Sequence, residues 1–230
     1  MNQAKNTYSA VYGLWLLGML LFGSALQAQA NIPPHQMLNG VTEKMLDTLR
    51  AEREAIREQP AYLFAVVEQV LLPHVEIHVM SRFVLGQHWR RASDEQKARF
   101  AEEFKNLLVR FYVSALLEDP QQLDSLLANS DTLIRFLPVT VTDETRTTTV
   151  RGEVFLPNNG PRVPVSFSLM RVEGEWLLYD VNVDGISLVS NYRTSFAADI
   201  NREGLDTLID RLEERNRRLL EEANRRAAAE

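Results

Sequence analysis

The sequence has 230 residues, of which 45% are hydrophobic and 24% charged, and it contains no cysteine. Without cysteine it cannot form a disulfide scaffold, a zinc finger, a thiol enzyme or a cysteine-ligated iron–sulfur cluster. The 25 Lys and Arg residues against 31 Asp and Glu give a net charge of −6, which argues against nucleic acid as the main partner. The composition is that of an ordinary globular protein.

The N-terminus has the three parts of a secretory signal peptide. Lys5 precedes an apolar run over residues 10–22, and Ala28-Gln29-Ala30 forms a cleavage site of the A-x-A type. A membrane anchor is the alternative, but the run is shorter than the roughly 20 residues that a spanning helix needs. We therefore predict cleavage after residue 30, which leaves an exported single domain, residues 31–230, with a net charge of −7.

The first part of this domain, residues 34–128, is predicted to be helical. Leu38, Met45 and Leu49 belong to an apolar stripe with helical spacing, and Gly86 is placed to end a later helix. Ser93 and Gln96 form a capping box for a long helix that carries a wide aromatic stripe.

The second part, residues 132–184, changes to a period of two. Apolar residues occupy the odd-numbered positions over 163–169 and 177–183, with Glu173-Gly174 and Asn158-Asn159-Gly160 as turns. With residues 133–141 and 145–156, these segments predict four antiparallel strands. Residues 187–226 return to helix, so we expect an α+β fold in which helices pack over one face of a curved four-stranded antiparallel sheet.

Residues capable of catalysis or metal binding are few. His74 and His78 are four residues apart but have no third ligand at helical spacing, so we expect no metal site. Asp180 and Asp184 lie on the polar side of the last strand and are expected to be turn or solvent-facing carboxylates rather than general acids. No nucleophile motif or phosphate-binding loop is present. What remains is an abundant apolar surface, whose periodicity fits both a packed core and an apolar cavity.

Three segments resemble the MlaC family of periplasmic phospholipid-shuttle proteins, also called toluene-tolerance auxiliary proteins. The most specific is WLLYDVNVDGISLVSNYRTSF over residues 176–196, and the others are RFVLGQHWR over 82–90 and FKNLLVRFY over 104–112. The resemblance covers nearly all of the exported chain, in order. One departure is visible at residues 73–77, PHVEI, where relatives typically show P-x-x-D-F, so any role tied to that shorter Asp is in doubt.

The resemblance implies a sheet of the nuclear-transport-factor-like kind with an apolar pocket between sheet and helices. It implies a carrier without enzymatic activity or cofactor, which binds a glycerophospholipid as cargo. Its implied partners are an outer-membrane lipoprotein–porin complex and an inner-membrane ABC transporter with a lipid-channel subunit, and its implied role is maintaining outer-membrane lipid asymmetry. The residues expected to line the pocket are Phe83, Phe104, Leu107, Leu108, Phe111, Val163, Val165, Phe167, Leu169, Val181, Val183 and Ile186.

Two other functions remain open. A small-molecule enzyme on the same sheet would need polar acid–base groups inside the cavity, and the apolar odd-numbered faces argue against it. A lipid-free adaptor of an ABC transporter would have no cavity at all. Docking residues cannot be assigned from sequence, although Arg90, Arg91, Arg110 and Arg193 are candidates because of their charge.

Overall fold

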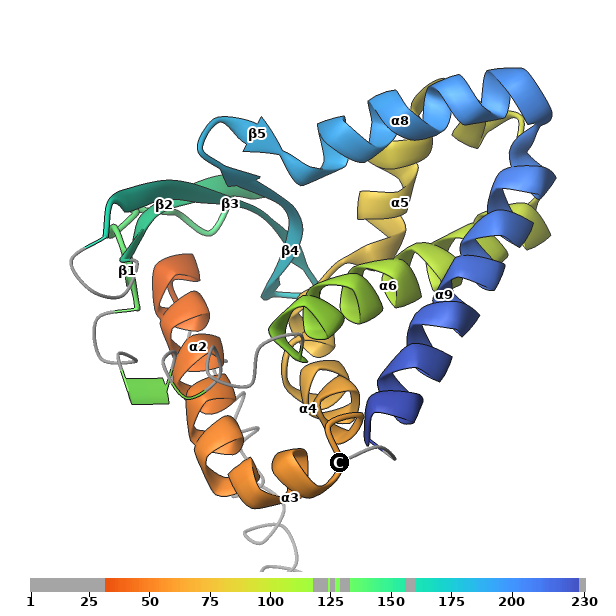
Figure 1. Cartoon of the computed structure of the whole chain (residues 1–230). Coiled ribbons are helices and arrows are strands. Elements are labelled where there is room, and N and C mark those ends of the chain that lie inside the picture. The colour runs from red at the N-terminus through yellow and green to blue at the C-terminus, as the bar shows by residue number, and fades with distance from the viewer. Residues whose placement is uncertain (1–31, 118–123, 125–126, 129–132, 156–159, 228–230) are drawn as a thin grey trace, which may run out of the picture. The chain divides into compact units, whose positions relative to one another are not determined.

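The computed structural model describes residues 32–117, 124, 127–128, 133–155 and 160–227 (Figure 1). All of them belong to the unit formed by Ile32–Glu230. The predicted signal peptide and the Asn158-Asn159 turn lie outside the described residues. No helix in the described ranges has a stretch long and apolar enough to cross a membrane.

The fold is mixed, with helices before and after an antiparallel sheet. The helices are α2 (Pro34–Ala51), α3 (Arg53–Glu58), α4 (Tyr62–Val70), α5 (Ile77–Leu85), α6 (Asp94–Leu117), α8 (Leu188–Glu203) and α9 (Leu205–Ala227), with 3-10 helices η1 (Leu72–His74) and η2 (Gly86–Arg90). The strands are β1 (Ile134–Phe136), β2 (Thr147–Phe155), β3 (Arg162–Val172), β4 (Glu175–Val183) and β5 (Ile186–Ser187). They are hydrogen-bonded in chain order, all antiparallel.

The sheet has five strands, so the predicted number of four was too low. Strand β5 was missed because it is only two residues long and follows a tight turn, in which Asp184 and Gly185 have φ angles of 50° and 85°. The first strand is also shorter than expected, since pairing stops at Phe136, two residues before Pro138.

The predicted alternation holds for β3 but fails for the first half of β4. A β-bulge lies between Ser168 and Leu169, beyond which Leu169 pairs with Leu178. Since paired residues share a face, Leu178 and Trp176 lie on the apolar side with Leu169, whereas Leu177 was predicted there. Tyr179 is the extra residue, and an isolated parallel bridge joins Leu178 to Val75 near the bulge.

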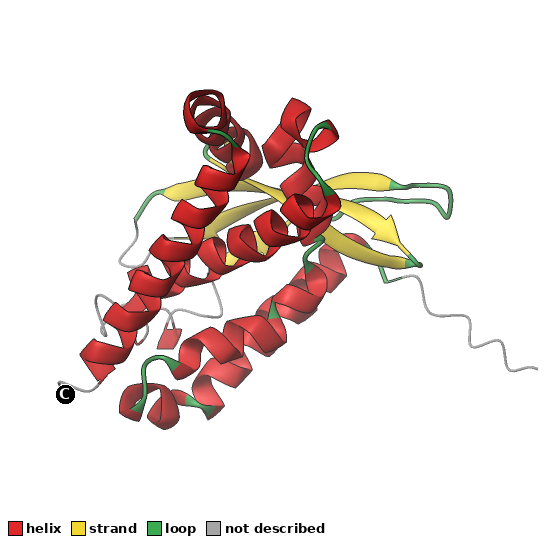
Figure 2. Cartoon of the chain, turned by 90° about the vertical axis from the view of Figure 1, so that its right-hand side faces the viewer, coloured by secondary structure: helices red, strands yellow, loops and turns green. Residues whose placement is uncertain are grey.

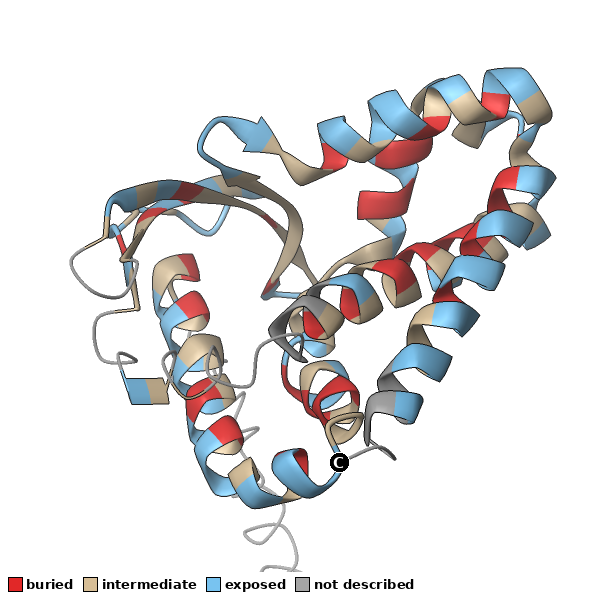
Figure 3. Cartoon of the chain, in the orientation of Figure 1, coloured by how far each residue is buried: buried red, intermediate tan, exposed pale blue. Residues whose placement is uncertain are grey.

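The main core lies among helices α5, α6, α8 and α9. It contains the fully buried Phe100 and Phe104, whose rings stack 5.7 Å apart, and Phe196, which meets both rings edge-on. Figure 3 shows the buried residues on the sides where these helices face one another. Helices α6 and α9 run side by side in both cartoon views (Figures 1 and 2).

Local signals set the ends of these helices as expected. The Ser93 N–H donates to Gln96 Oε1 at 2.9 Å and the Gln96 N–H donates to Ser93 Oγ at 3.1 Å, which confirms the capping box. Gly86 ends α5 with a φ of 53°. The last helical segment is divided at Gly204, whose φ of 88° separates α8 from α9.

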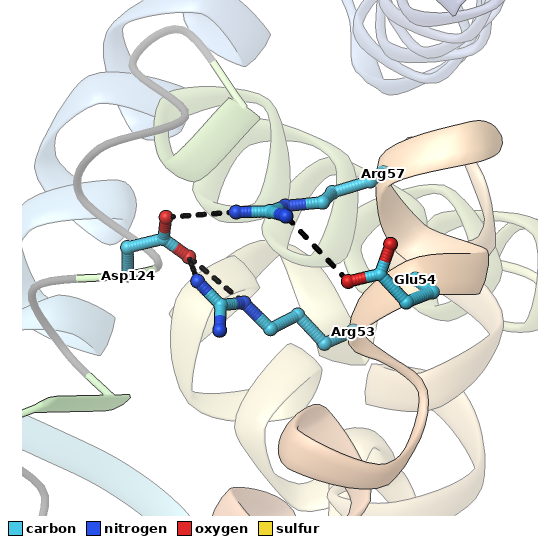
Figure 4. Close-up of polar contacts among 4 residues, drawn as sticks. All are labelled: Arg53, Glu54, Arg57 and Asp124. Carbon is cyan, nitrogen blue, oxygen red and sulfur yellow. Dashed lines mark hydrogen bonds and ion pairs between the residues drawn. The ribbon is translucent and has the colours of Figure 1, made fainter.

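A second core joins α2, α3 and α4 to one side of α6, and an ion-pair cluster lies at its edge. Asp124 accepts hydrogen bonds from Arg53 Nη2 at 2.6 Å and from Arg57 Nη2 at 3.1 Å, while Arg57 also pairs with Glu54 (Figure 4). The hydrogen bond from Arg53 lowers the pKa of Asp124 below its usual range.

Candidate functional site

The face of the sheet that carries the helices is almost entirely apolar. Strand pairing places Val150, Phe167 and Val181 in one row, and Gly152, Val165, Val183 and Ile186 in the next. Thr148 and Arg171 bear the only polar side chains among the described paired residues of this face. It therefore offers no acid–base pair for catalysis and is suited to holding apolar groups.

Helix α2 buries the β1–β3 side of this face. Leu38 packs in one cluster with Phe136, Val150, Leu169 and Trp176, all of which are buried. The rings of Phe136 and Phe167 lie 5.4 Å apart in an edge-on arrangement. The apolar side chains of β2 and β3 are thus covered where α2 crosses them.

Burial decreases along the same face toward β4 and β5. In the row that begins at the buried Gly152, the exposed fraction rises from 7% at Val165 to 46% at Val183 and 67% at Ile186. Figure 3 shows β5 and the turn before it as exposed. We call this region, formed by Val163, Val181, Val183 and Ile186, the open apolar edge.

Helix α5 adds an aromatic pair beside β4. The Phe83 side chain is 39% exposed, and its ring centroid lies 5.6 Å from that of Tyr179. The Arg82 guanidinium lies over the Phe83 ring at 5.5 Å. Since Tyr179 is the bulge residue, the bulge brings its ring next to this helix.

The structure places the twelve predicted pocket residues in three groups. Those on the sheet share one face and are graded from the buried Leu169 to the exposed Ile186. On the helices, Phe83 is in ring contact with Tyr179 of the sheet; Phe104 and Leu107 are buried in the helical core, and Leu108 packs against it. Phe111 lies about two turns beyond Phe104 along α6 and is exposed, with the Arg215 guanidinium of α9 over its ring at 5.7 Å.

Several residues of the same face were missed by the sequence analysis. Val154 pairs with both Val163 and Ile134, so these three form a further row of half-buried apolar side chains. The alternation of Val150, Gly152 and Val154 in β2 was a usable signal. Tyr179 belonged to the predicted odd-numbered row, but the bulge at this residue could not be found in this way, because no periodicity predicts a bulge.

Asp180 has a structural role that its pattern did not indicate. Its carboxylate accepts hydrogen bonds from the Ser187 hydroxyl at 2.7 Å and from the Val189 N–H at 3.0 Å, while Ser187 itself caps α8 by accepting from the Ser190 N–H. A carboxylate at a helix N-terminus satisfies free N–H groups and complements the helix dipole. Asp180 thereby ties β4 to the start of α8.

The histidines considered for a metal site do not gather ligands. No group of three potential metal-ligating side chains occurs among the residues that the structure describes. Burial lowers the pKa of His74, and the nearby positive charge of Lys44 acts in the same direction.

Comparisons with known proteins agree on one family. Residues 39–214 match the family described as MlaC protein. The chain is 31% identical to the toluene tolerance protein ttg2D of Pseudomonas putida, over 84% of this chain and 85% of that protein. It is 23% identical to the intermembrane phospholipid transport system binding protein MlaC of Haemophilus influenzae, over 81% and 84% of the two chains.

A solved structure shares the fold. The phospholipid-binding protein of Ralstonia solanacearum, determined in complex with a phospholipid, is 25% identical, with a TM-score of 0.65 over 80% of this chain and 97% of that one. Fold, sequence signature and relatives point the same way, and the chain belongs to the MlaC family.

Proposed function

We propose that this protein is a periplasmic carrier that binds a glycerophospholipid by its acyl chains. It would be exported with removal of residues 1–30. It would then carry the lipid between an outer-membrane lipoprotein–porin complex and an inner-membrane ABC transporter with a lipid-channel subunit, and so maintain outer-membrane lipid asymmetry. Membership of the MlaC family and the phospholipid bound to the Ralstonia solanacearum protein support this proposal.

The observation that carries the proposal is the graded burial of one apolar face. Soluble proteins seldom leave contiguous large apolar side chains uncovered unless these bind a ligand or partner. Here Val183 and Ile186 are 46% and 67% exposed although they continue the row that includes the buried Val165. An acyl chain lying along the open apolar edge would cover these side chains.

The energetics explain why such a carrier is needed. Two acyl chains of ordinary length contain about 30 methylene groups, so their transfer from a bilayer to water costs on the order of 20 kcal/mol. A protein surface that shields both chains removes most of this cost and makes transfer close to thermoneutral. The direction of transport must then come from the membrane complexes, because a carrier alone cannot bias an equilibrium.

We assign the acyl-chain contacts to the sheet and to α5, and the remaining predicted residues other than the exposed Phe111 to the packed interior. The proposed contact residues are Phe83, Val163, Phe167, Val181, Val183 and Ile186. Phe104 and Leu107 have no exposed surface to offer in this arrangement, since they are 0% and 1% exposed. No catalytic step is proposed, because the described apolar face carries no carboxylate.

The proposal is tested by native mass spectrometry and lipid extraction on the exported protein, purified from the periplasm without detergent. We expect a mass excess equal to one or more phospholipids, which solvent extraction removes and identifies. A protein that is purified folded and empty, and takes up no phospholipid from vesicles, would favour the lipid-free adaptor instead. A matched Ile186→Glu variant shows whether the retained lipid depends on the open apolar edge.

A further inference from the structure

Two stretches of the chain contain arginine but no acidic residue. Residues 77–93 and 185–198 include Arg82, Arg90, Arg91 and Arg193, and neither stretch contains a single Asp or Glu, although the whole chain has 31. Both belong to the segments that carry the family signature. More than 90 residues separate the two stretches, so the absence of acidic residues in both does not reflect one locally biased segment of the sequence.

The fold brings the two stretches together. The first forms α5 and η2 and the second forms β5 and the first part of α8, and α5 packs directly against α8. The aliphatic part of Arg193 lies over the end of α5, because a Cβ added to Gly86 would be 3.3 Å from Arg193 Cδ. Arg82 and Arg90 lie four residues before and after Gly86. We call Arg82, Arg90, Arg91 and Arg193 the arginine surface; all four are exposed.

No described carboxylate neutralises this surface. Arg193 donates to the Ser190 hydroxyl at 3.3 Å and Arg82 lies over the Phe83 ring. None of the four arginines forms an ion pair with a described residue. Glu76 and Glu95 flank the first stretch and form no ion pair with these arginines among the described residues, and the other nearby acids are engaged elsewhere or exposed. Asp180 caps α8, Asp199 pairs with Arg202 and Arg211, Asp94 pairs with Lys97, and Asp184 is exposed in the turn before Gly185.

Such an arrangement does nothing for the stability of the isolated protein. Like charges gathered without counter-charges repel one another and favour the binding of an anionic partner. The remainder of residues 31–230 has 20 cations and 31 acids, a net charge of −11. Arginines without described counter-ions therefore come together where α5, η2 and the start of α8 pack, in an otherwise acidic protein. Arg82 borders the aromatic pair of Phe83 and Tyr179, and the second stretch includes Ile186 of the open apolar edge.

We propose that the arginine surface docks an acidic patch of a partner protein, next to the edge at which cargo enters and leaves. A protein partner fits better than a bilayer because a small acidic patch contacts only these arginines. Acidic residues further from the contact than the Debye length of about 8 Å repel such a patch little. An extended anionic membrane would also face the strongly acidic remainder of the chain. Arginine is suited to this contact because its planar guanidinium binds carboxylates in a bidentate manner. The position relative to cargo rests on the proposed function, whereas the docking itself does not.

Of the four arginines considered from sequence, Arg110 is excluded from this surface. Its Nη1 donates to the backbone oxygen of Asn216 at 2.6 Å and so joins α6 to α9. Arg82, which was not among them, takes its place. The distinction depends on packing, because charge alone does not separate a structural arginine from a docking one.

The test compares two triple variants of the exported protein. The first is Arg82→Gln, Arg90→Gln and Arg193→Gln; the control removes the same charge from α9 by Arg215→Gln, Arg218→Gln and Arg225→Gln. The probe is a fluorescent deca-glutamate peptide, with vesicles of phosphatidylcholine, alone or with phosphatidylglycerol, as the membrane alternative. We expect the parent and the control to bind the peptide in a salt-dependent manner, and the first variant to bind about tenfold more weakly or worse.

Each other outcome overturns the docking proposal. Equal weakening in both triple variants, or no peptide binding by the parent, would show that the surface has no specific role. Arginine-dependent sedimentation with phosphatidylglycerol vesicles would assign the surface to a membrane. The first variant should keep its melting temperature and its co-purified phospholipid. Because the lipid content of the parent is measured in the same samples, failure of lipid binding is distinguished from failure of docking.

Discussion

Asp180 and Val189 are joined by a hydrogen bond of 3.0 Å between a strand carboxylate and the second backbone N–H of α8. Asp180 lies on the polar face of β4, opposite Ser168, and the next residue is Val181 of the open apolar edge. The carboxylate also accepts the Ser187 hydroxyl at 2.7 Å. One side chain therefore fixes both the path of the β4–β5 turn and the start of the helix that follows.

Replacing Asp180 by Ala should destabilise the protein by about 1–3 kcal/mol, because it leaves a helix N–H and a hydroxyl without their partner. Urea denaturation measures the loss. Asp184→Asn is the matched control, because Asp184 is exposed, directly follows the last paired residue Val183, and has a φ of 50° that Asn also tolerates; it should change stability by less than about 0.5 kcal/mol. Equal effects of the two substitutions would contradict the capping role.

Ile186→Glu should leave folding intact and abolish phospholipid co-purification. The side chain is 67% exposed, so a carboxylate there reaches water and changes stability by about 0.5 kcal/mol or less. A charge at the open apolar edge nevertheless opposes an acyl chain. Circular dichroism, melting and lipid extraction give the three readouts. A grossly unfolded variant would mean that Ile186 holds the helix start to the core, and a folded variant that keeps its lipid would reject the rim placement.

The two faces of β3 should respond in opposite ways to a new carboxylate. Phe167→Glu places the charge on the apolar face, beside Phe136 and between Val150 and Val181, and should remove bound lipid or unfold the protein. Ser166→Glu places it on the other face, where the paired residues are Arg151 and Asn182, and should be tolerated. Phe167→Ala keeps the test informative if the Glu variant does not fold. The face assignment is wrong if Ser166→Glu loses lipid while Phe167→Glu retains it.

Phe104→Ala should cost about 3–5 kcal/mol of unfolding free energy without selectively removing lipid. The ring is fully buried and lies 5.3 Å from the Tyr192 ring, so its removal leaves a cavity inside the helical core. Phe111→Ala, at a side chain that is 42% exposed, should cost about 1 kcal/mol or less. Urea unfolding measures the loss of stability in each variant, and the lipid-to-protein ratio of the purified protein measures lipid retention. Loss of lipid from a still-folded Phe104→Ala protein would return this residue to the binding site.

The Asp124 cluster should contribute to stability at neutral pH and cease to do so in acid. Because the hydrogen bond from Arg53 holds the pKa of Asp124 below its value in the unfolded chain, the contribution is full above the unfolded pKa and is lost as the pH falls through the folded one. The relevant range lies below about pH 4. Asp124→Asn should lower the melting temperature by a few degrees at most at pH 7, and the difference should vanish in strong acid. A difference that grows on acidification would contradict the ion pair.

Local signals in the sequence predicted local structure well. The capping box of Ser93 and Gln96, the helix end at Gly86 and the Glu173-Gly174 turn involve only neighbouring residues, and all three are found. Each depends on hydrogen bonds or φ angles that a few adjacent residues determine. The change from helical to strand periodicity likewise identified the fold class.

Features that depend on tertiary contact could not be predicted in this way. Periodicity marks which side of an element is buried but not what covers it, so Phe104 in the helical core and Phe83 beside β4 looked alike. The bulge at Tyr179 occurs where Leu178 bridges to Val75, about 100 residues earlier in the chain, a contact that no local pattern contains. The cap formed by Asp180 was missed because its partners, Ser187 and Val189, lie beyond the turn that ends β4.

The extra residue Tyr179 reverses the alternation of side chains halfway along β4. Before Tyr179 the even-numbered side chains face the α2 side, as at Trp176 and Leu178; after it the odd-numbered ones do, as at Val181 and Val183. The first half of β4 therefore packs into a core, and the second half contributes to the open apolar edge, which is proposed to bind lipid. Deleting Tyr179 would shift one half of β4 by one residue relative to β3, and the side chains of that half would then point to the other face of the sheet. A homologue without this residue would lose either the core packing of Trp176 and Leu178 or the apolar surface of Val181 and Val183.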